Sequence, residues 1–245
     1  MHYFCNDCSN EESKLMKRIL FFVLALVLCS FVFFYCDKED DILKNVSPSI
    51  EMHNGHEYVD LGLPSGLLWA TCNVGAESPE DYGDYFAWGE TSPKSDYDTY
   101  KYYSSSTDEL TKYCTDSDYG PTDTKTTLDL IDDAARVNLG GSWRMPTSAE
   151  QDELREKCTW TWTTLNGIKG YKVTSKSNGN SIFLPAAGYR DGADVYSVGS
   201  LGDYWSSSLG SDSPDGACSL GFDSDGVNWY YDDRFYGHTV RAVCP

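Results

Sequence analysis

Basic residues are scarce in this chain of 245 residues. Only 19 Lys and Arg stand against 38 Asp and Glu, so the formal net charge is -19. A surface with this charge repels a phosphate backbone, which excludes nucleic acid as an expected partner. The hydrophobic fraction of 40% still allows a core, and the abundant Gly, Tyr and Trp favour a β-rich, loop-rich domain.

Residues that could perform nucleophilic or acid–base catalysis are also few. After the apolar N-terminal run, the histidines are His53, His56 and His238, and a nucleophile needs a base within hydrogen-bonding distance. The sequence contains no Gly-x-Ser-x-Gly, no phosphate-binding loop and no His-Glu-x-x-His motif. We therefore expect no enzymatic activity, no catalytic residue and no cofactor.

Two acidic turns contain oxygen ligands of the kind that calcium prefers. They are Asp223-Ser224-Asp225-Gly226 and Asp232-Asp233. Acidic residues in turns are more often solvated than bound to metal, so the sequence predicts no metal site.

The N-terminal residues have the pattern of an export signal. Residues 1–15 show no periodicity and precede a second methionine, which suggests an upstream extension. Residues 16–36 contain Lys17 and Arg18, an apolar run and then Cys36. The alternative is a membrane anchor that is not cleaved, because the run is nearly long enough to span a bilayer.

The acidic residues that follow Cys36 resemble those of Bacteroidetes lipoproteins, in which this cysteine is acylated and the protein is exported to the cell surface. Tyr35 departs from that pattern, because a small residue usually precedes the cysteine. The resemblance implies lipidation at Cys36 and an outer-membrane, cell-surface location, with the membrane contacted only through the lipid. Residues 37–55 are then a tether, and residues 56–245 are a single domain.

The cysteines after residue 36 are odd in number. They are Cys72, Cys114, Cys158, Cys218 and Cys244. An exported protein can form disulfides, but at least one of these thiols is left unpaired or pairs with another molecule, and sequence alone does not determine the pairing.

Two helices and several strands are predicted in the domain. Residues 127–139 place an apolar stripe at helical spacing, with a glycine stop after it. Thr147 and Glu150 form a capping box for a second helix that runs to about Lys157. Residues 159–175 form a hairpin around Asn166-Gly167, and residues 181–184 form a strand. Residues 82–119 are expected to be long loops.

The C-terminal residues 202–244 alternate large apolar residues with Asp, Ser, Gly, Asn and Tyr. The alternation is strict in residues 217–223, which is the period of a half-buried strand. An ordinary β-rich surface with turns would give the same pattern. We interpret Trp205, Leu220, Phe222, Trp229 and Val240 as a rigid apolar support beneath one binding rim.

Tyrosine among small polar residues is typical of a binding loop. The candidate rim residues are Asp212, Ser213, Asp215, Ser219, Asp223, Asp225, Asn228, Tyr230, Tyr231, Asp232, Asp233, Phe235, Tyr236 and His238. Arg234 is expected to be a framework residue that pairs with a buried carboxylate.

Several motifs follow one another along the domain in a fixed order. They are Glu57-Tyr58-Val59-Asp60-Leu61-Gly62-Leu63-Pro64-Ser65-Gly66, Trp69-Ala70-Thr71-Cys72-Asn73-Val74-Gly75, Tyr85-Phe86-Ala87-Trp88-Gly89-Glu90, Asp132-Asp133-Ala134-Ala135, Gly141-Ser142-Trp143-Arg144-Met145-Pro146-Thr147, Leu184-Pro185-Ala186-Ala187-Gly188, Tyr204-Trp205-Ser206-Ser207-Ser208 and Val240-Arg241-Ala242-Val243. Together they resemble the FISUMP family, the Fibrobacter succinogenes major paralogous domain. The resemblance covers nearly all of residues 56–244. It implies an α+β, C-type-lectin-like fold with two helices, a small antiparallel sheet and long loops that bear the ligand surface.

The same fold occurs in the variable proteins of diversity-generating retroelements, whose codons for the binding surface are rewritten. Rewriting of adenines in Asn codons cannot yield Lys, Glu, Gln or Met, and this chain has none of these after Lys176. Selection for a polar β-surface would leave the same composition. Diversification is therefore a hypothesis.

These features together predict a surface lipoprotein that binds an extracellular protein or glycan non-covalently. The alternatives are a structural or adhesive surface subunit without a discrete pocket and, less favoured, an enzyme similar to the formylglycine-generating enzymes. Those enzymes use paired cysteines near the C-terminus, and Cys218 and Cys244 lie in no matching motif.

Overall fold

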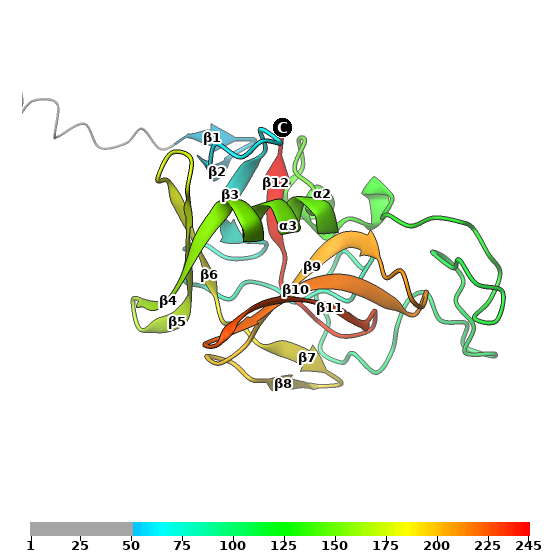
Figure 1. The fold of residues 1–245 in the computed structure, drawn as a ribbon. Coiled ribbons are helices and arrows are strands. Elements are labelled where there is room, and N and C mark those ends of the chain that lie inside the picture. Colours follow the sequence, from blue (N-terminus) through cyan, green and yellow to red (C-terminus); the bar gives the residue numbers. More distant parts are fainter. Residues whose placement is uncertain (1–50) are drawn as a thin grey trace, which may run out of the picture. The chain divides into compact units, whose positions relative to one another are not determined.

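The computed structural model describes residues 51–245, and residues 50–245 form one compact unit. Within these residues the fold is α+β, with two α-helices and several small antiparallel sheets (Figure 1). The predictions for residues 1–15 and 16–36, including lipidation at Cys36, lie outside the described part. No helix in that described part is long and apolar enough to cross a membrane.

The first sheet joins the two ends of the domain. Its strands are β1 (Met52–His53), β2 (His56–Asp60), β3 (Leu68–Asn73) and β12 (Arg241–Cys244), in the antiparallel order β1-β2-β3-β12. The C-terminal strand thus lies beside β3 (Figure 1).

The domain begins earlier than the sequence indicated. β1 falls within the predicted tether 37–55, where it pairs with β2 through the turn at Asn54-Gly55. The backbone oxygen of His53 also accepts a hydrogen bond of 3.0 Å from Trp143 Nε1. The missed signal was the Asn-Gly turn, which favours a hairpin.

The predicted helix 127–139 is wrong in extent. A 3₁₀ turn covers Leu130–Asp132, and α2 covers only Ala134–Leu139. The break occurs at Asp133, whose extended backbone lets its side chain cap the Arg136 amide. Ile131, predicted on the buried stripe, is 76% exposed. An apolar spacing alone does not show that a helix contacts the core.

The second predicted helix is confirmed as α3 (Ser148–Lys157). Thr147 caps the Glu150 amide, and the Glu150 carboxylate accepts from the Thr147 amide at 2.8 Å, which completes the capping box.

The predicted hairpin is confirmed as β4 (Cys158–Leu165) and β5 (Ile168–Ser175). Asn166 and Gly167 both have positive φ, as the tight turn between these strands requires. β6 (Ser181–Pro185) is the predicted third strand and completes the sheet β4-β5-β6.

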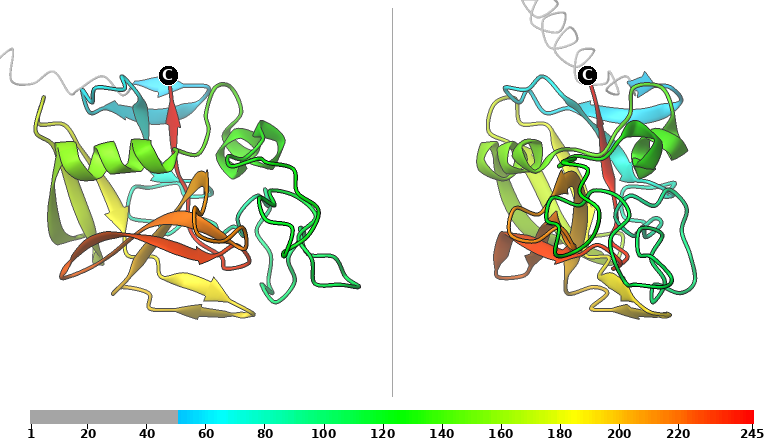
Figure 2. Two further views of the ribbon diagram at one scale, coloured as in Figure 1. Left: turned by 45° about the vertical axis from the view of Figure 1, so that its right-hand side comes forward. Right: turned by 90° about the vertical axis from the view of Figure 1, so that its right-hand side faces the viewer.

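A third sheet has the order β11-β10-β9 and carries the C-terminal segment. Its strands are β9 (Gly202–Leu209), β10 (Gly216–Asp223) and β11 (Gly226–Asp233). The hairpin of β7 (Tyr189–Asp191) and β8 (Asp194–Tyr196) lies on the side of this sheet away from α3 (Figures 1 and 2). α3 packs against β9 and β10.

The expected loops at residues 82–119 are confirmed, since they contain only isolated bridges such as Tyr103 with Leu110. They extend to one side of the sheets (Figure 2). Buried aromatic residues in these loops, including Tyr97, Tyr100 and Tyr113, pack into one of the two core clusters.

Candidate functional site

The sheet β11-β10-β9 presents two different faces. Leu220 of β10 lies opposite Trp229 of β11 and Tyr204 of β9. The preceding residue, Ser219, lies opposite Tyr230 of β11 and Trp205 of β9. Because side chains alternate along a strand, these two sets point to opposite sides. We call the side with Ser219 and Tyr230 the pocket face, and the side with Leu220, which packs against α3, the helix face.

The apolar support predicted beneath one rim is therefore divided. Leu220, Phe222 and Trp229 belong to the core cluster on the helix face. Trp205 and Val240 belong to the other cluster. The prediction of a single support is wrong, because β10 is a central strand covered on both sides and is buried along residues 216–222.

The prediction that Ser219 is a rim residue is also wrong, and Gly221 on the same face is covered too. Ser219 is fully buried and its hydroxyl donates to the Asp232 carboxylate. Gly221 is covered by Tyr230, since a Cβ there would lie 2.6 Å from the tyrosine ring and 2.9 Å from Asp203 Oδ1. A glycine inside a strand often marks such a close approach.

A pocket of about 270 Å³ opens on the pocket face. Strands β7, β9 and β11 form its walls, together with the residues just before β9 and just after β11. The lining residues are Tyr189, Leu201, Asp203, Tyr230, Asp232, Tyr236 and His238.

Asp203 is the most perturbed acid of this pocket. The residue is only 7% exposed. Burial, with the negative charge of Asp232 as a second cause, raises the pKa of Asp203 to about 8. Below about pH 8 this carboxyl group therefore holds a proton, and above it the group is a poorly solvated anion that a nearby cation would stabilise.

His238 is a buried imidazole with an unsatisfied atom. Its ring stacks on Trp205 at 4.0 Å between centroids. Its Nδ1 lies 3.9 Å from Asp232 Oδ2 and has no hydrogen-bond partner among the described residues. Burial lowers the pKa of His238 to about 4 despite the opposing charge of Asp232, so the ring is neutral at pH 7.

Three tyrosines supply most of the remaining pocket wall. Tyr189 and Tyr236 meet edge to face at 5.7 Å between centroids, and Tyr189 also stacks on Tyr196 at 5.5 Å. Tyr230 is 46% exposed. The pocket therefore combines aromatic rings with buried hydrogen-bond acceptors, an arrangement suited to binding.

Arg234 holds the chain segment that supplies Tyr236 and His238. The guanidinium donates to the carbonyls of Lys112, Tyr113 and Pro214 and to Tyr100 Oη, at 2.8–3.2 Å. It also lies over the rings of Trp88, Tyr100, Tyr102 and Tyr113. Arg234 is a framework residue as expected, but the predicted carboxylate partner is wrong. Carbonyls and aromatic rings replace it.

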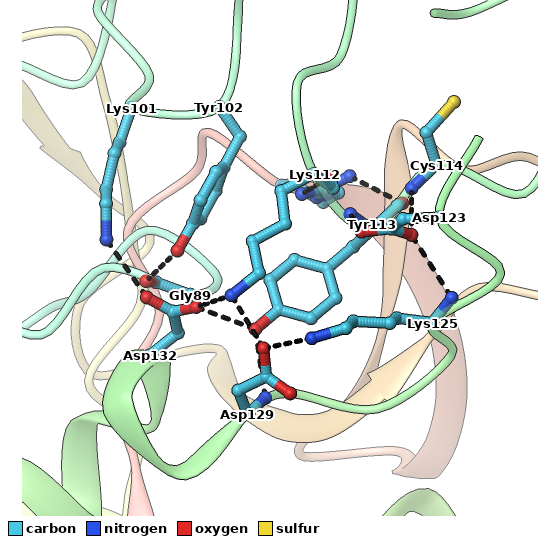
Figure 3. Close-up of polar contacts among 11 residues, drawn as sticks. Gly89, Lys101, Tyr102, Lys112, Tyr113, Cys114, Asp123, Lys125, Asp129 and Asp132 are labelled. Atoms are coloured by element: carbon cyan, nitrogen blue, oxygen red, sulfur yellow. Dashed lines mark hydrogen bonds and ion pairs between the residues drawn. The ribbon is translucent and has the colours of Figure 1, made fainter. Parts of the chain in front are cut away.

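An ion-pair network fixes the loops around Arg234 (Figure 3). The buried carboxylate of Asp132 accepts from Lys101 at 3.0 Å, Lys112 at 2.5 Å and the Tyr113 hydroxyl at 2.7 Å. Despite burial, these donors hold the pKa of Asp132 below its usual range. The loops are thus tied to the 3₁₀ turn that contains Asp132.

Some of the predicted rim residues come together, and others do not. Tyr230, Asp232, Tyr236 and His238 line the pocket, and Ser219 supports it from below. The other predicted residues lie outside the pocket lining. Asn228 is on the pocket face, Tyr231 is on the helix face and Asp233 ends β11. Before β10 lie Asp212, Ser213 and Asp215, at the β10–β11 turn lie Asp223 and Asp225, and Phe235 is partly buried in the core.

Sequence reasoning missed Tyr189, Leu201 and Asp203. Asp203 had a usable signal, because Asp203 and Trp205 share a face of β9 by the period of two. Tyr189 comes from a separate hairpin, and no local pattern connects it with the C-terminal strands.

All five cysteines in the described residues are free thiols, and Cys114, Cys158, Cys218 and Cys244 are buried. Within residues 51–245, no group of three or more His, Cys, Asp or Glu is placed so that it could hold a metal ion.

Comparisons of this chain with models of protein families, with curated proteins and with solved structures gave no match.

Proposed function

We propose that this domain binds a ligand non-covalently in the pocket on the pocket face of β9–β11. The observation that carries the proposal is a buried imidazole nitrogen without a partner beside a buried carboxyl group in the pocket wall. Buried polar groups in folded proteins are nearly always hydrogen-bonded, yet His238 Nδ1 has no such partner among the described residues, and Asp203 in the same lining is 7% exposed. A polar ligand with an apolar part would gain both hydrogen bonds and aromatic contact there.

The proposed fold is C-type-lectin-like, as the resemblance to the FISUMP family implies. Two helices, small antiparallel sheets and the long loops of residues 82–119 support this assignment. In this scheme the C-terminal strands carry the ligand surface, which agrees with a pocket between β9, β11 and the segment that follows.

The proposed setting is the cell surface, through a lipid on Cys36, and the partner is an extracellular protein or glycan. Metabolic labelling with a palmitate analogue tests the anchor: Cys36→Ser is expected to abolish label, and an unchanged signal would refute lipidation there. Targeted diversification predicts a neighbouring reverse transcriptase gene and a near-copy of the 3′ coding segment.

Adjacent tyrosines offer a matched test of the pocket. Tyr230 lines the pocket and is 46% exposed, whereas Tyr231 points to the helix face and is 55% exposed. The full chain is first used to identify a partner on glycan arrays and in cell-surface extracts. Tyr230→Ala and Tyr236→Ala are expected to lose that binding, and Tyr231→Ala is expected to retain it.

Equal effects of Tyr230→Ala and Tyr231→Ala, with folding intact, would contradict the pocket. A structural or adhesive subunit remains the second candidate. It is favoured by the exposed Val195 and Tyr196 of β8 and by the exposed Val198 just after this strand, and it predicts no saturable binding on any array.

A further inference from the structure

Carboxylates surround the pocket, and no Lys or Arg among residues 51–245 pairs with them. Burial and then the charges of Asp191, Asp233 and Asp232 raise the pKa of Tyr236, and the charge that acts on Asp203 and His238 is again Asp232. Among the ion pairs of residues 51–245, none joins these aspartates to Lys or Arg. The negative potential of the pocket is therefore not neutralised by the protein itself.

The aromatic wall is suited to a positive charge. A cation near the face of a tyrosine is attracted by the ring quadrupole, and the attraction grows when water is excluded. Tyr189, Tyr230 and Tyr236 all contribute to the lining. The chain already uses this interaction in its interior, where Arg234 lies 4.9 Å from the Trp88 ring centroid and near three tyrosine rings.

The polar groups of the lining favour a ligand that donates hydrogen bonds. Asp203 offers carboxyl oxygens, and the neutral His238 offers a buried Nδ1 that lacks a partner in the described chain. A quaternary ammonium has no N–H to donate, whereas a protonated primary amine has three. A divalent metal ion needs several closely grouped ligands, and the described residues hold no such group.

We infer that the pocket binds a primary alkylammonium group, with the amine between Asp203, His238 and the rings of Tyr189, Tyr230 and Tyr236. The inference rests on the proposed binding function of this same pocket. Either a lysine side chain of a protein partner or a free small amine presents this chemistry.

The first experiment uses small probes with the full chain. Binding of n-butylammonium is measured by ligand-observed NMR or calorimetry, with 1-butanol as the uncharged control and tetramethylammonium as the cation without N–H donors. Saturable binding of n-butylammonium at least about tenfold tighter than either control is expected, given the strength of charge-assisted hydrogen bonds. Equal binding of n-butylammonium and 1-butanol would overturn the inference.

Variants locate the amine within the pocket. Asp203→Asn keeps the side-chain shape and removes the charge, so a loss of about tenfold or more is expected. Tyr230→Ala is expected to weaken binding about threefold to tenfold, while Tyr231→Ala leaves it unchanged. A thermal unfolding curve for each variant shows whether the fold is retained. Unchanged amine affinity in a folded Asp203→Asn variant would overturn the assignment.

The source of the amine is then separated by two ligands. Nα-acetyl-lysine methylamide presents a lysine side chain, and its Nε-acetylated form is the uncharged control. Binding of the first and not the second supports a protein partner, whereas binding of n-butylammonium alone supports a free amine.

Failure of this inference is distinguishable from failure of the proposed function. If Tyr230→Ala abolishes partner capture but no amine probe binds, the pocket functions and the amine assignment is wrong. If Tyr230→Ala changes neither partner capture nor amine binding, both proposals fail.

Discussion

Tyr230 and Tyr231 are consecutive residues of β11 that face opposite sides of the sheet. Tyr230 lies opposite Ser219 on the pocket face, and Tyr231 lies opposite Cys218 on the helix face. Two tyrosines that look equivalent in the sequence therefore have different surroundings. The pocket is built from alternate residues of this strand and from side chains of other segments.

The first prediction concerns Gly221, the residue that leaves room for the Tyr230 ring. Its backbone is outside the left-handed region, so alanine is tolerated locally, but the added Cβ would lie 2.6 Å from the ring and 2.9 Å from Asp203 Oδ1. Tyr230 is exposed enough to swing outward. Gly221→Ala is therefore expected to weaken ligand binding about tenfold or more while changing the free energy of unfolding by about 1 kcal/mol or less.

Gly226→Ala is the matched control, because a Cβ at this position meets nothing within 4 Å. It is expected to change neither binding nor stability appreciably. Retained binding by a folded Gly221→Ala variant would show that Tyr230 need not lie against the strand.

Local signals in the sequence predicted those elements that depend on neighbouring residues. The capping box of Thr147 and Glu150 predicted α3, and Asn166-Gly167 predicted the hairpin, because both motifs act over a few residues. The candidate site was predicted only in part. Whether one or both faces of β10 are buried depends on the β7–β8 hairpin and α3, which no residue within β10 encodes.

The same limit explains the two errors about buried residues. The alternation of apolar and polar residues predicts that Ser219 is exposed. In the structure it is buried, because Asp232 and its neighbours cover that face of the strand. The helical spacing predicts that Ile131 is in the core. In the structure the helix is interrupted at Asp133, and Ile131 is exposed to solvent.

The second prediction concerns the stability of the domain between pH 6.5 and 8. The folded pKa of Asp203, about 8, lies above its unfolded value of 3.8, so the native state holds a proton that the unfolded state has lost. The free energy of unfolding therefore falls as pH rises through this window, by at most about 1.4 kcal/mol per pH unit.

His238 acts differently, because its pKa falls from 6.5 to about 4 on folding. Its contribution to the free energy of unfolding therefore increases as pH rises from 4 to 6.5 and is constant above pH 6.5.

Urea unfolding at pH 6.5, 7.25 and 8 measures this slope. Asp203→Asn removes the titrating group, and the variant is expected to show a flatter profile with a gain over the original chain of about 1–2 kcal/mol at pH 8 relative to pH 6.5. The other titratable groups of the pocket lining, namely Asp232, His238, Tyr189, Tyr230 and Tyr236, are retained in this variant. Parallel profiles for the two proteins would show that Asp203 is ionised in the folded state.

The third prediction concerns amine binding over the same pH range. Since an ammonium ion favours the ionised carboxylate, n-butylammonium must displace the proton of Asp203 below pH 8. Its affinity is expected to rise by up to about tenfold per pH unit from pH 6 to 8 and to level off above. Isothermal titration at several pH values measures both the slope and the proton released. A pH-independent affinity would place the ammonium away from Asp203.

The last prediction concerns Arg234, whose removal tests whether the loops and the pocket wall are one unit. Arg234→Met fills similar volume but leaves four acceptors, on Tyr100, Lys112, Tyr113 and Pro214, without their donor. Each buried neutral acceptor left without its donor typically costs about 1–3 kcal/mol, and we expect a loss of at least about 3 kcal/mol in the free energy of unfolding. Lys125→Met is the control, since the side chain of this lysine is 43% exposed and its Nζ pairs with Asp129, while the backbone amide that donates to Asp123 is retained. The cost of this substitution is expected to stay below about 1 kcal/mol. Because residues 234–238 connect Arg234 to Tyr236 and His238, hydrogen exchange of the His238 amide should accelerate in Arg234→Met and not in Lys125→Met. Protection of that amide in a folded Arg234→Met variant would show that the pocket wall is held by Trp205 and the bridge to Phe86 instead.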